Sequence, residues 1–75
     1  MKLIRFGNET LNVDEIYRVS HRECYDANTD EYYLYAEIYI KNEKEPVVFS
    51  KESRSHDEPY DSFMNFLDGD SIDQI

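Results

Sequence analysis

The most regular hydrophobic pattern in the chain lies in residues 32–41, where apolar and more polar positions alternate. The even positions hold a tyrosine, a leucine, an alanine and two isoleucines, whereas the odd positions hold three tyrosines, a glutamate and a lysine. A period of two predicts a β-strand, because successive side chains of a strand point to opposite faces. We expect the even face on the core and an aromatic stripe on the other face, made of Tyr33, Tyr35 and Tyr39.

Three shorter segments rich in apolar residues predict further strands near residues 2–6, 16–24 and 46–50. Turn-forming residues separate the segments, and the residues from Asp26 to Asp30 form the loop of a hairpin between the second and third strands. Pro46 suits the start of the last strand, because proline cannot donate to the hydrogen-bond ladder. The strands together predict an antiparallel four-stranded meander.

The second of these strands also alternates, which predicts the face of each side chain. Tyr17 and Val19 fall on one face with His21, whereas Ile16 and Arg18 fall on the other.

A different period begins after residue 58 and predicts a helix near residues 59–68. Apolar side chains recur there at i, i+3, i+4 and i+7, in the order Tyr60, Phe63, Met64 and Leu67. Gly69 stands where a left-handed helix terminator is expected, followed by an acidic tail over residues 70–75. The chain is therefore predicted to be a single α+β domain in which one C-terminal helix packs on one face of the four-stranded sheet.

The charge of the chain changes which partners are expected. It holds 17 acidic and 8 basic residues, a net charge of -9, which exceeds the magnitude of about 2 to 8 that suffices for solubility. Such a field disfavours nucleic acid and anionic membranes and favours basic protein surfaces. No apolar run approaches the roughly 20 residues that span a bilayer. The first residues do not resemble a secretory leader and a single cysteine allows no internal disulfide, so we expect a cytoplasmic protein.

The acidic residues gather toward the C-terminus. Residues 55–75 contain six of them and no lysine or arginine, which predicts a negative pole at the helical end. Strand carboxylates two positions apart lie about 6.6 Å from each other, close to two phosphate steps of a DNA strand. Imitation of a nucleic-acid backbone is one interpretation, and a solvated charged face is the other.

Catalytic and cofactor-binding patterns are weak in this sequence. His21 and Cys24 are three residues apart on a strand, which places them on opposite faces. Gly7 and Gly69 are the two glycines and cannot build a phosphate-binding loop. We therefore expect no enzyme activity and no cofactor.

A calcium site is the one alternative to the expectation that the protein binds no cofactor. Asp26, Asn28, Asp30 and Glu37 follow the ligand spacing of a calcium-binding EF-hand loop. The sixth position of that loop is normally glycine but is Glu31 here, and a strand follows instead of a helix. A hairpin loop whose Asx side chains bond their own backbone is the competing interpretation.

In size, acidity, tyrosine content and predicted architecture, the whole chain resembles the small phage-encoded inhibitors of bacterial defence, including anti-CRISPR proteins and other DNA mimics. The resemblance rests on no motif. It implies a non-enzymatic inhibitor that occupies a basic nucleic-acid-binding surface of a defence nuclease or effector complex in the host cytoplasm. The residues expected to contact that partner are Tyr33, Tyr35, Glu37, Tyr39, Asp57, Glu58, Asp61, Asp68, Asp70 and Asp73.

Two features of this hypothesis have competing interpretations. The tyrosine stripe is either exposed as an interaction surface or covered by cross-strand neighbours and by the stems of Arg18, Lys41 and Lys51. The runner-up function is a small homodimeric structural or adaptor protein of a bacterial or phage family, joined through the stripe or a sheet edge, whose acidity only keeps it soluble.

Overall fold

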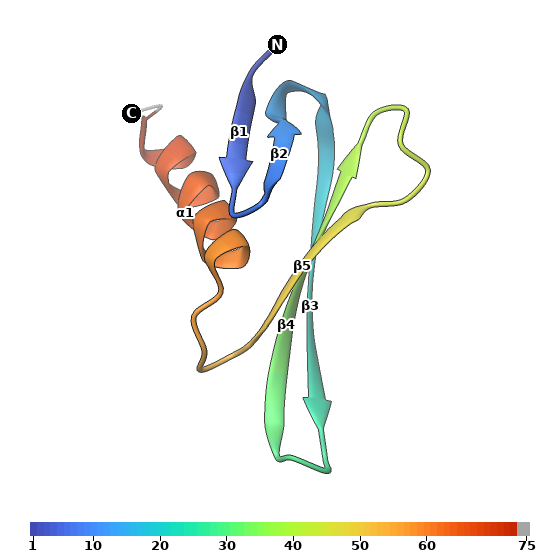
Figure 1. The fold of residues 1–75 in the computed structure, drawn as a ribbon, viewed down its shortest axis with the longest axis vertical. Coiled ribbons are helices and arrows are strands. Elements are labelled where there is room, and N and C mark those ends of the chain that lie inside the picture. The colour runs from blue at the N-terminus through green and yellow to red at the C-terminus, as the bar shows by residue number, and fades with distance from the viewer. Residues whose placement is uncertain (74–75) are drawn as a thin grey trace.

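The structure is a computed structural model that describes the backbone of residues 1–73 and the side chains of residues 1–69. Figure 1 shows two antiparallel sheets and one helix. The elements in chain order are β1 (Leu3–Phe6), β2 (Glu9–Asn12), the 3₁₀ turn η1 (Val13–Glu15), β3 (Ile16–Asp26), β4 (Glu31–Ile40), β5 (Val47–Glu52) and α1 (Glu58–Asp73).

The α+β class and the single C-terminal helix packed on a sheet are confirmed, but the four-stranded meander is wrong. β1 pairs with β2 in a two-stranded sheet, and the other three strands form a second sheet in the order β3-β4-β5. The sequence does not reveal β2, because Leu11 is its one apolar residue and a four-residue strand with one apolar position shows no period.

The turn between β1 and β2 brings the first hairpin against the helix. Gly7 and Asn8 connect Phe6 to Glu9 in a two-residue turn, and Gly7 has a φ of 62°. A Cβ atom at Gly7 would lie 2.4 Å from Cγ of Pro59, in the first turn of α1. The close approach of hairpin and helix therefore depends on glycine at this position.

The core lies between the even face of β4 and the helix, as the two periods predict. Ala36 and Ile38 are fully buried. The fully buried ring of Phe63 on α1 lies edge-on to Phe6 on β1 at 5.2 Å, and its centroid is 5.8 Å from that of Phe49 on β5. Aromatic rings from β1, β5 and α1 thus join both sheets to the helix.

The predicted faces of β3 are wrong at its first residues. The register between β3 and β4 shifts between Ile16 and Arg18, so Tyr17 is an extra residue in the ladder. Ile16 consequently packs against the core, as Val19 does, and the Tyr17 ring lies 6.2 Å from that of Tyr39 on the opposite face. A bulge of one residue reverses the alternation that precedes it.

The predicted C-terminus of the helix is wrong as well. The helix continues through Gly69 to Asp73, so residues 70–73 are helical instead of a tail, and Gly7 is the glycine with positive φ in the described chain. A glycine inside a helix costs about 1 kcal/mol, and no proline follows to end the helix. Residues 74–75 lie outside the described part of the chain, as do the side chains of residues 70–73.

The β3–β4 hairpin extends beyond the helix and gives the molecule an elongated shape of 43 × 32 × 22 Å (Figure 1). We call residues 21–33 the arm and the remaining described residues the body. Every buried residue belongs to the body, whereas no residue of the arm is buried. Within residues 1–73, no helix has the length and apolar content needed to cross a membrane.

Candidate functional site

The tyrosine stripe lies on the face of the sheet that is opposite to the helix. Its three residues are half-buried. The Arg18 guanidinium carbon lies 5.1 Å from the Tyr39 ring centroid, and that of Arg22 lies 5.2 Å from the Tyr35 ring centroid. Both arginines belong to β3 and stack on the β4 ring that pairs with them across the ladder. The stripe is therefore partly covered, which favours the second of its two interpretations.

Lysine covers a different aromatic ring from the one expected. Lys51 lies on the core face of β5, where its Nζ atom is 5.4 Å from the ring centroid of Tyr60 on α1. Lys41 is exposed in the turn after β4. The cover over the stripe thus consists of Arg18 together with Arg22, whose role the sequence does not reveal.

The predicted partner-binding residues fall into two groups that do not share a face. Glu37 belongs to the stripe face of β4, whereas the helix packs on the core face. Glu58 and Asp68 are exposed on the helix, and the side chains of Asp70 and Asp73 lie outside the described residues. A partner with one flat surface therefore does not contact the helical carboxylates and the stripe at the same time.

Asp57 and Asp61 make contacts within the protein. Asp57 caps the helix, because its Oδ1 atom accepts the backbone N–H of Tyr60 at 3.0 Å. Asp61 Oδ2 accepts the Asp57 N–H at 3.1 Å, and Asp61 Oδ1 accepts a hydrogen bond from Lys51 Nζ at 2.7 Å. The hydrogen bond from Lys51, followed by that from the Asp57 amide, lowers the pKa of Asp61. These two carboxylates are therefore used in building the helix terminus.

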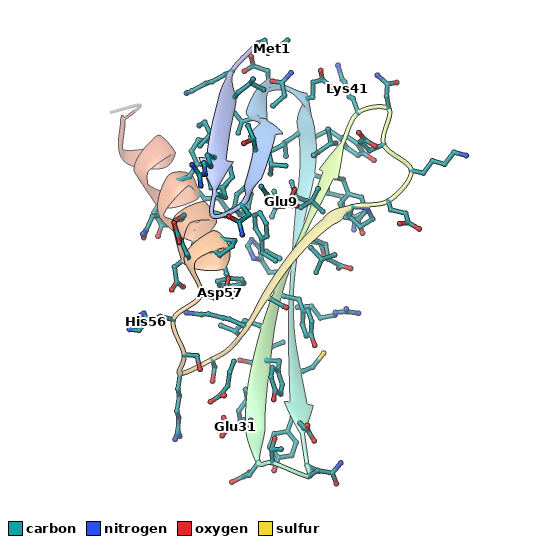
Figure 2. The ribbon with its side chains drawn as sticks, viewed as in Figure 1. Met1, Glu9, Glu31, Lys41, His56 and Asp57 are labelled. Atoms are coloured by element: carbon teal, nitrogen blue, oxygen red, sulfur yellow. The ribbon has the colours of Figure 1, made fainter. Side chains whose placement is uncertain are left out.

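The two histidines lie in different surroundings, His56 beside a carboxylate and His21 on the opposite face of the sheet from Cys24. Figure 2 shows His56 pointing away from the molecule, and its Nδ1 atom is 3.7 Å from Asp61 Oδ2. His21 pairs with Ala36 on the core face, whereas Cys24 pairs with Tyr33 on the stripe face. The predicted separation of His21 and Cys24 is confirmed.

The four residues of the calcium alternative do not come together. Asp26 accepts the N–H of Asn28 at 2.9 Å, and Asp30 accepts the hydroxyl of Tyr25, so the loop bonds within the arm. Glu37 is six residues along β4 from the loop, about 20 Å at the rise of a strand. Among residues 1–69, no cluster of three or more His, Cys, Asp or Glu side chains is arranged to hold a metal ion.

A different cluster of carboxylates, which we call the acidic groove, surrounds a cavity in the body. The cavity has a volume of about 360 Å³. Its lining residues are Glu9, Thr10, Leu11, Asn12, Glu15, Ile40, Glu43, Glu45 and Val47. It thus combines four carboxylates with three aliphatic side chains, and no lysine or arginine lines it.

Several elements contribute to the acidic groove. Glu9 belongs to β2, Glu15 to η1, and both Glu43 and Glu45 to the loop between β4 and β5. Figure 2 shows Glu9 at the foot of the β1–β2 hairpin, beside β5. Asn12 donates a hydrogen bond from Nδ2 to Glu15 Oε1 at 3.0 Å, which orients this carboxylate.

Sequence reasoning missed the acidic groove, because its acids come from three separated segments. Each glutamate alone resembles an ordinary polar residue of a turn or a short strand. The one local signal is the pair Glu43 and Glu45, which flank Lys44 in the loop after β4. Chemically, a groove of this kind accommodates a lysine or arginine side chain, with the stem on the aliphatic residues and the cation among the carboxylates.

No protein-family model, curated protein or solved structure matches the chain. The resemblance to phage-encoded inhibitors of bacterial defence therefore stays a prediction.

Proposed function

We propose that the protein is a non-enzymatic inhibitor that docks on a basic protein surface and occupies the place of nucleic acid there. The partner class is a nuclease or effector complex of bacterial defence, and the compartment is the cytoplasm of the host cell. The single observation that carries the proposal is the acidic groove, where four glutamates and three aliphatic residues line one cavity without a basic residue.

The mixture of aliphatic and acidic residues that lines the acidic groove favours a cationic side chain over a free metal ion. Leu11, Ile40 and Val47 supply an apolar surface that a hydrated cation does not use. A lysine or arginine side chain uses both parts, because its methylene stem is apolar and its head is charged. Arginine is the better fit, since its planar guanidinium pairs with carboxylates in a fixed geometry.

The net charge supports a nucleic-acid-binding partner. At -9, the chain attracts the strongly basic channels that bind a phosphate backbone and raises the rate of encounter with them. The helical carboxylates Glu58 and Asp68 contribute to this long-range attraction without lining the groove. The carboxylates of the helix thus attract the partner over a distance, whereas the glutamates of the acidic groove contact it.

Two charge-matched variants test this assignment. Glu43→Gln/Glu45→Gln alters the groove, and Glu58→Gln/Asp68→Asn alters the helix surface, and each removes two negative charges. Binding to an arginine-rich peptide is measured by calorimetry at low and at physiological salt. We expect the groove variant to bind about tenfold more weakly and the helix variant to lose less than about threefold.

Capture from a bacterial lysate then tests the class of partner. The wild-type chain should capture nucleic-acid-binding proteins preferentially, and added salt should release them. While they are bound to the chain, these proteins should not bind DNA. Equal losses for the two variants would show that net charge alone causes peptide binding and would contradict the groove. If captured partners bind DNA equally well with and without the chain, the proposal that the chain takes the place of nucleic acid is contradicted.

A further inference from the structure

The outer side of β3 is an unpaired edge of the three-stranded sheet. In the order β3-β4-β5, β3 pairs with β4 alone. The five consecutive residues from His21 to Tyr25 are all exposed, and Figure 1 shows this part of β3 beyond the helix and the first hairpin. A long exposed edge presents backbone groups to which another strand can pair.

The register identifies which residues of β3 direct their backbone groups outward. The Tyr32 carbonyl accepts the N–H of Ser53 at 2.8 Å, so the even residues of β4 face the β5 side and the odd residues face β3. Arg22 pairs with Tyr35 and Cys24 with Tyr33, so the even residues of β3 face β4. The odd residues from Val19 to Tyr25 therefore direct their N–H and C=O groups toward the free side.

We propose that a second copy of this chain pairs with this edge, antiparallel, through residues 19–25 of β3. The two-fold axis passes between the Arg22 residues of the two copies. His21 and Glu23 then lie opposite Glu23 and His21 of the second copy, and Val19 lies opposite Tyr25. The pairing supplies about eight backbone hydrogen bonds and joins both three-stranded sheets into one.

Charge complementarity selects this register. It places Arg18 opposite Asp26 of the second copy, twice by symmetry, and it places the His21 imidazole opposite the Glu23 carboxylate, to which a ring N–H donates a hydrogen bond without needing a charge on the histidine. The guanidinium of Arg22 leans over the Tyr35 ring on β4, away from the edge, which reduces the repulsion across the axis.

The neighbouring two-fold registers lack these pairs. With the axis at Glu23, two glutamates face each other and Asp26 faces Ser20. With the axis at His21, two histidines face each other and Arg18 faces Cys24. The axis at Arg22 also places two like charges opposite each other, but it alone of the three registers adds the pairs of Arg18 with Asp26 and of His21 with Glu23, so it gives the best pairing.

The edge also differs from the rest of the molecule in local charge. Residues 16–26 hold two basic and two acidic residues, whereas the whole chain has a net charge of -9. Self-association at this edge is consequently opposed by long-range repulsion, which salt screens. Added salt should leave the dimer unchanged or strengthen it, whereas it weakens binding at the acidic groove.

The first test is sedimentation velocity of the wild type and of His21→Pro. Proline at position 21 removes an outward N–H that is unpaired in the monomer, so the fold tolerates it and the dimer does not. We expect dimers of the wild type at micromolar concentration and at least about a tenfold loss of affinity for the variant. A wild type that stays monomeric up to about 1 mM overturns the proposal.

The second test is a charge exchange that leaves the monomer ladder unaltered. His21 and Glu23 pair with Ala36 and Leu34 within the monomer, so changes at these positions meet no charge on β4. His21→Glu should weaken the dimer about tenfold, because it places two like-charged pairs across the axis, and His21→Glu/Glu23→Lys should restore it. Absence of rescue, with both variants folded by circular dichroism, overturns the register.

Discussion

The β-ribbon of β3 and β4 runs through both the body and the arm of this protein, yet the two regions bury their side chains to very different degrees. In the body, β3 and β4 lie against the helix and the first hairpin, and Ala36, Ile38 and Phe63 are fully buried. In the arm, the same strands pair with equal regularity, but Tyr25 and Tyr32 are 52% and 48% exposed. Regular strand pairing therefore does not by itself create a core.

The comparison indicates that the stability of the fold depends on the body and not on the arm. Apolar burial supplies the driving force of folding, so the free energy of unfolding depends on the body. The arm is a regular ribbon with an unpaired edge, and the acidic groove lies where the first hairpin meets β5. The predictions below test this division, beginning with the largest effect.

Removal of the Phe63 ring from the core should give the largest difference in stability between a variant in the body and a variant in the arm. Phe63→Ala should lower the free energy of unfolding by about 3–5 kcal/mol, because it removes the ring that contacts both Phe6 and Phe49. Tyr32→Ala in the arm should cost less than about 1 kcal/mol. Urea unfolding followed by circular dichroism measures both, and similar losses would contradict the division.

The contact between the first hairpin and the helix should be the next most sensitive. Gly7→Ala should destabilise the fold by about 2 kcal/mol or more, because it strains a positive φ and drives Cβ into Pro59. Gly69→Ala is the matched control, since its added Cβ meets nothing within 4 Å among the described residues beyond its own turn of helix. It should stabilise the helix by about 0.5–1 kcal/mol, and thermal unfolding of both variants checks the opposite signs.

The helix terminus should give the body a stability that depends on pH. The pKa of Asp61 is lowered in the folded state, so its ionised form stabilises the fold above the unfolded pKa of about 3.9. That contribution is lost as pH falls through the lower, folded pKa. Asp61→Asn should therefore be less stable than the wild type at pH 7 and equally stable in strong acid, and denaturant unfolding across this range measures the difference.

Asp68→Asn is the control for Asp61→Asn, because Asp68 is an exposed carboxylate on the same helix. An equal pH dependence of both variants would contradict the role of Lys51 at Asp61.

A carboxylate of the arm, Glu31, should show the smallest effect of pH on the free energy of unfolding, and this effect should be opposite in sign to that of Asp61. A side-chain hydrogen bond with Glu52 raises the pKa of Glu31, so ionisation of Glu31 is less favourable in the folded state. The stabilisation present below the unfolded pKa of about 4.3 is lost as pH rises through the folded pKa. Glu31→Gln should accordingly be slightly more stable than the wild type at pH 7 and indistinguishable from it in acid.

Glu43→Gln controls for the loss of one charge from the chain as a whole. It should not reproduce the pH dependence of Glu31→Gln in parallel unfolding measurements, because Glu43 lies in an exposed loop away from Glu52.

Local periodicity predicts the elements and faces that depend on neighbours in sequence. The alternation over residues 32–41 predicts which side of β4 meets the core, and the spacing of Tyr60, Phe63 and Met64 predicts the buried face of the helix. Such patterns are readable because they repeat within one or two turns or pleats.

The candidate sites were far less predictable, because each depends on residues that the fold brings together. The acidic groove combines Glu9 and Glu15 with Glu43 and Glu45, across most of the first two-thirds of the chain. The stripe and the helical carboxylates have clear local patterns, and the two periods already place the stripe on the face of the sheet that is opposite to the helix.

By itself, then, the sequence determined the periods of β4 and the helix, their buried faces and the acidic character of the whole. Only the tertiary structure decided the division into two sheets, the bulge at Tyr17, the continuation of the helix through Gly69 and the position of the acidic groove. The physical reason is that periodicity records whether a side chain faces the core, whereas the identity of the segment it meets depends on packing between residues far apart in the chain.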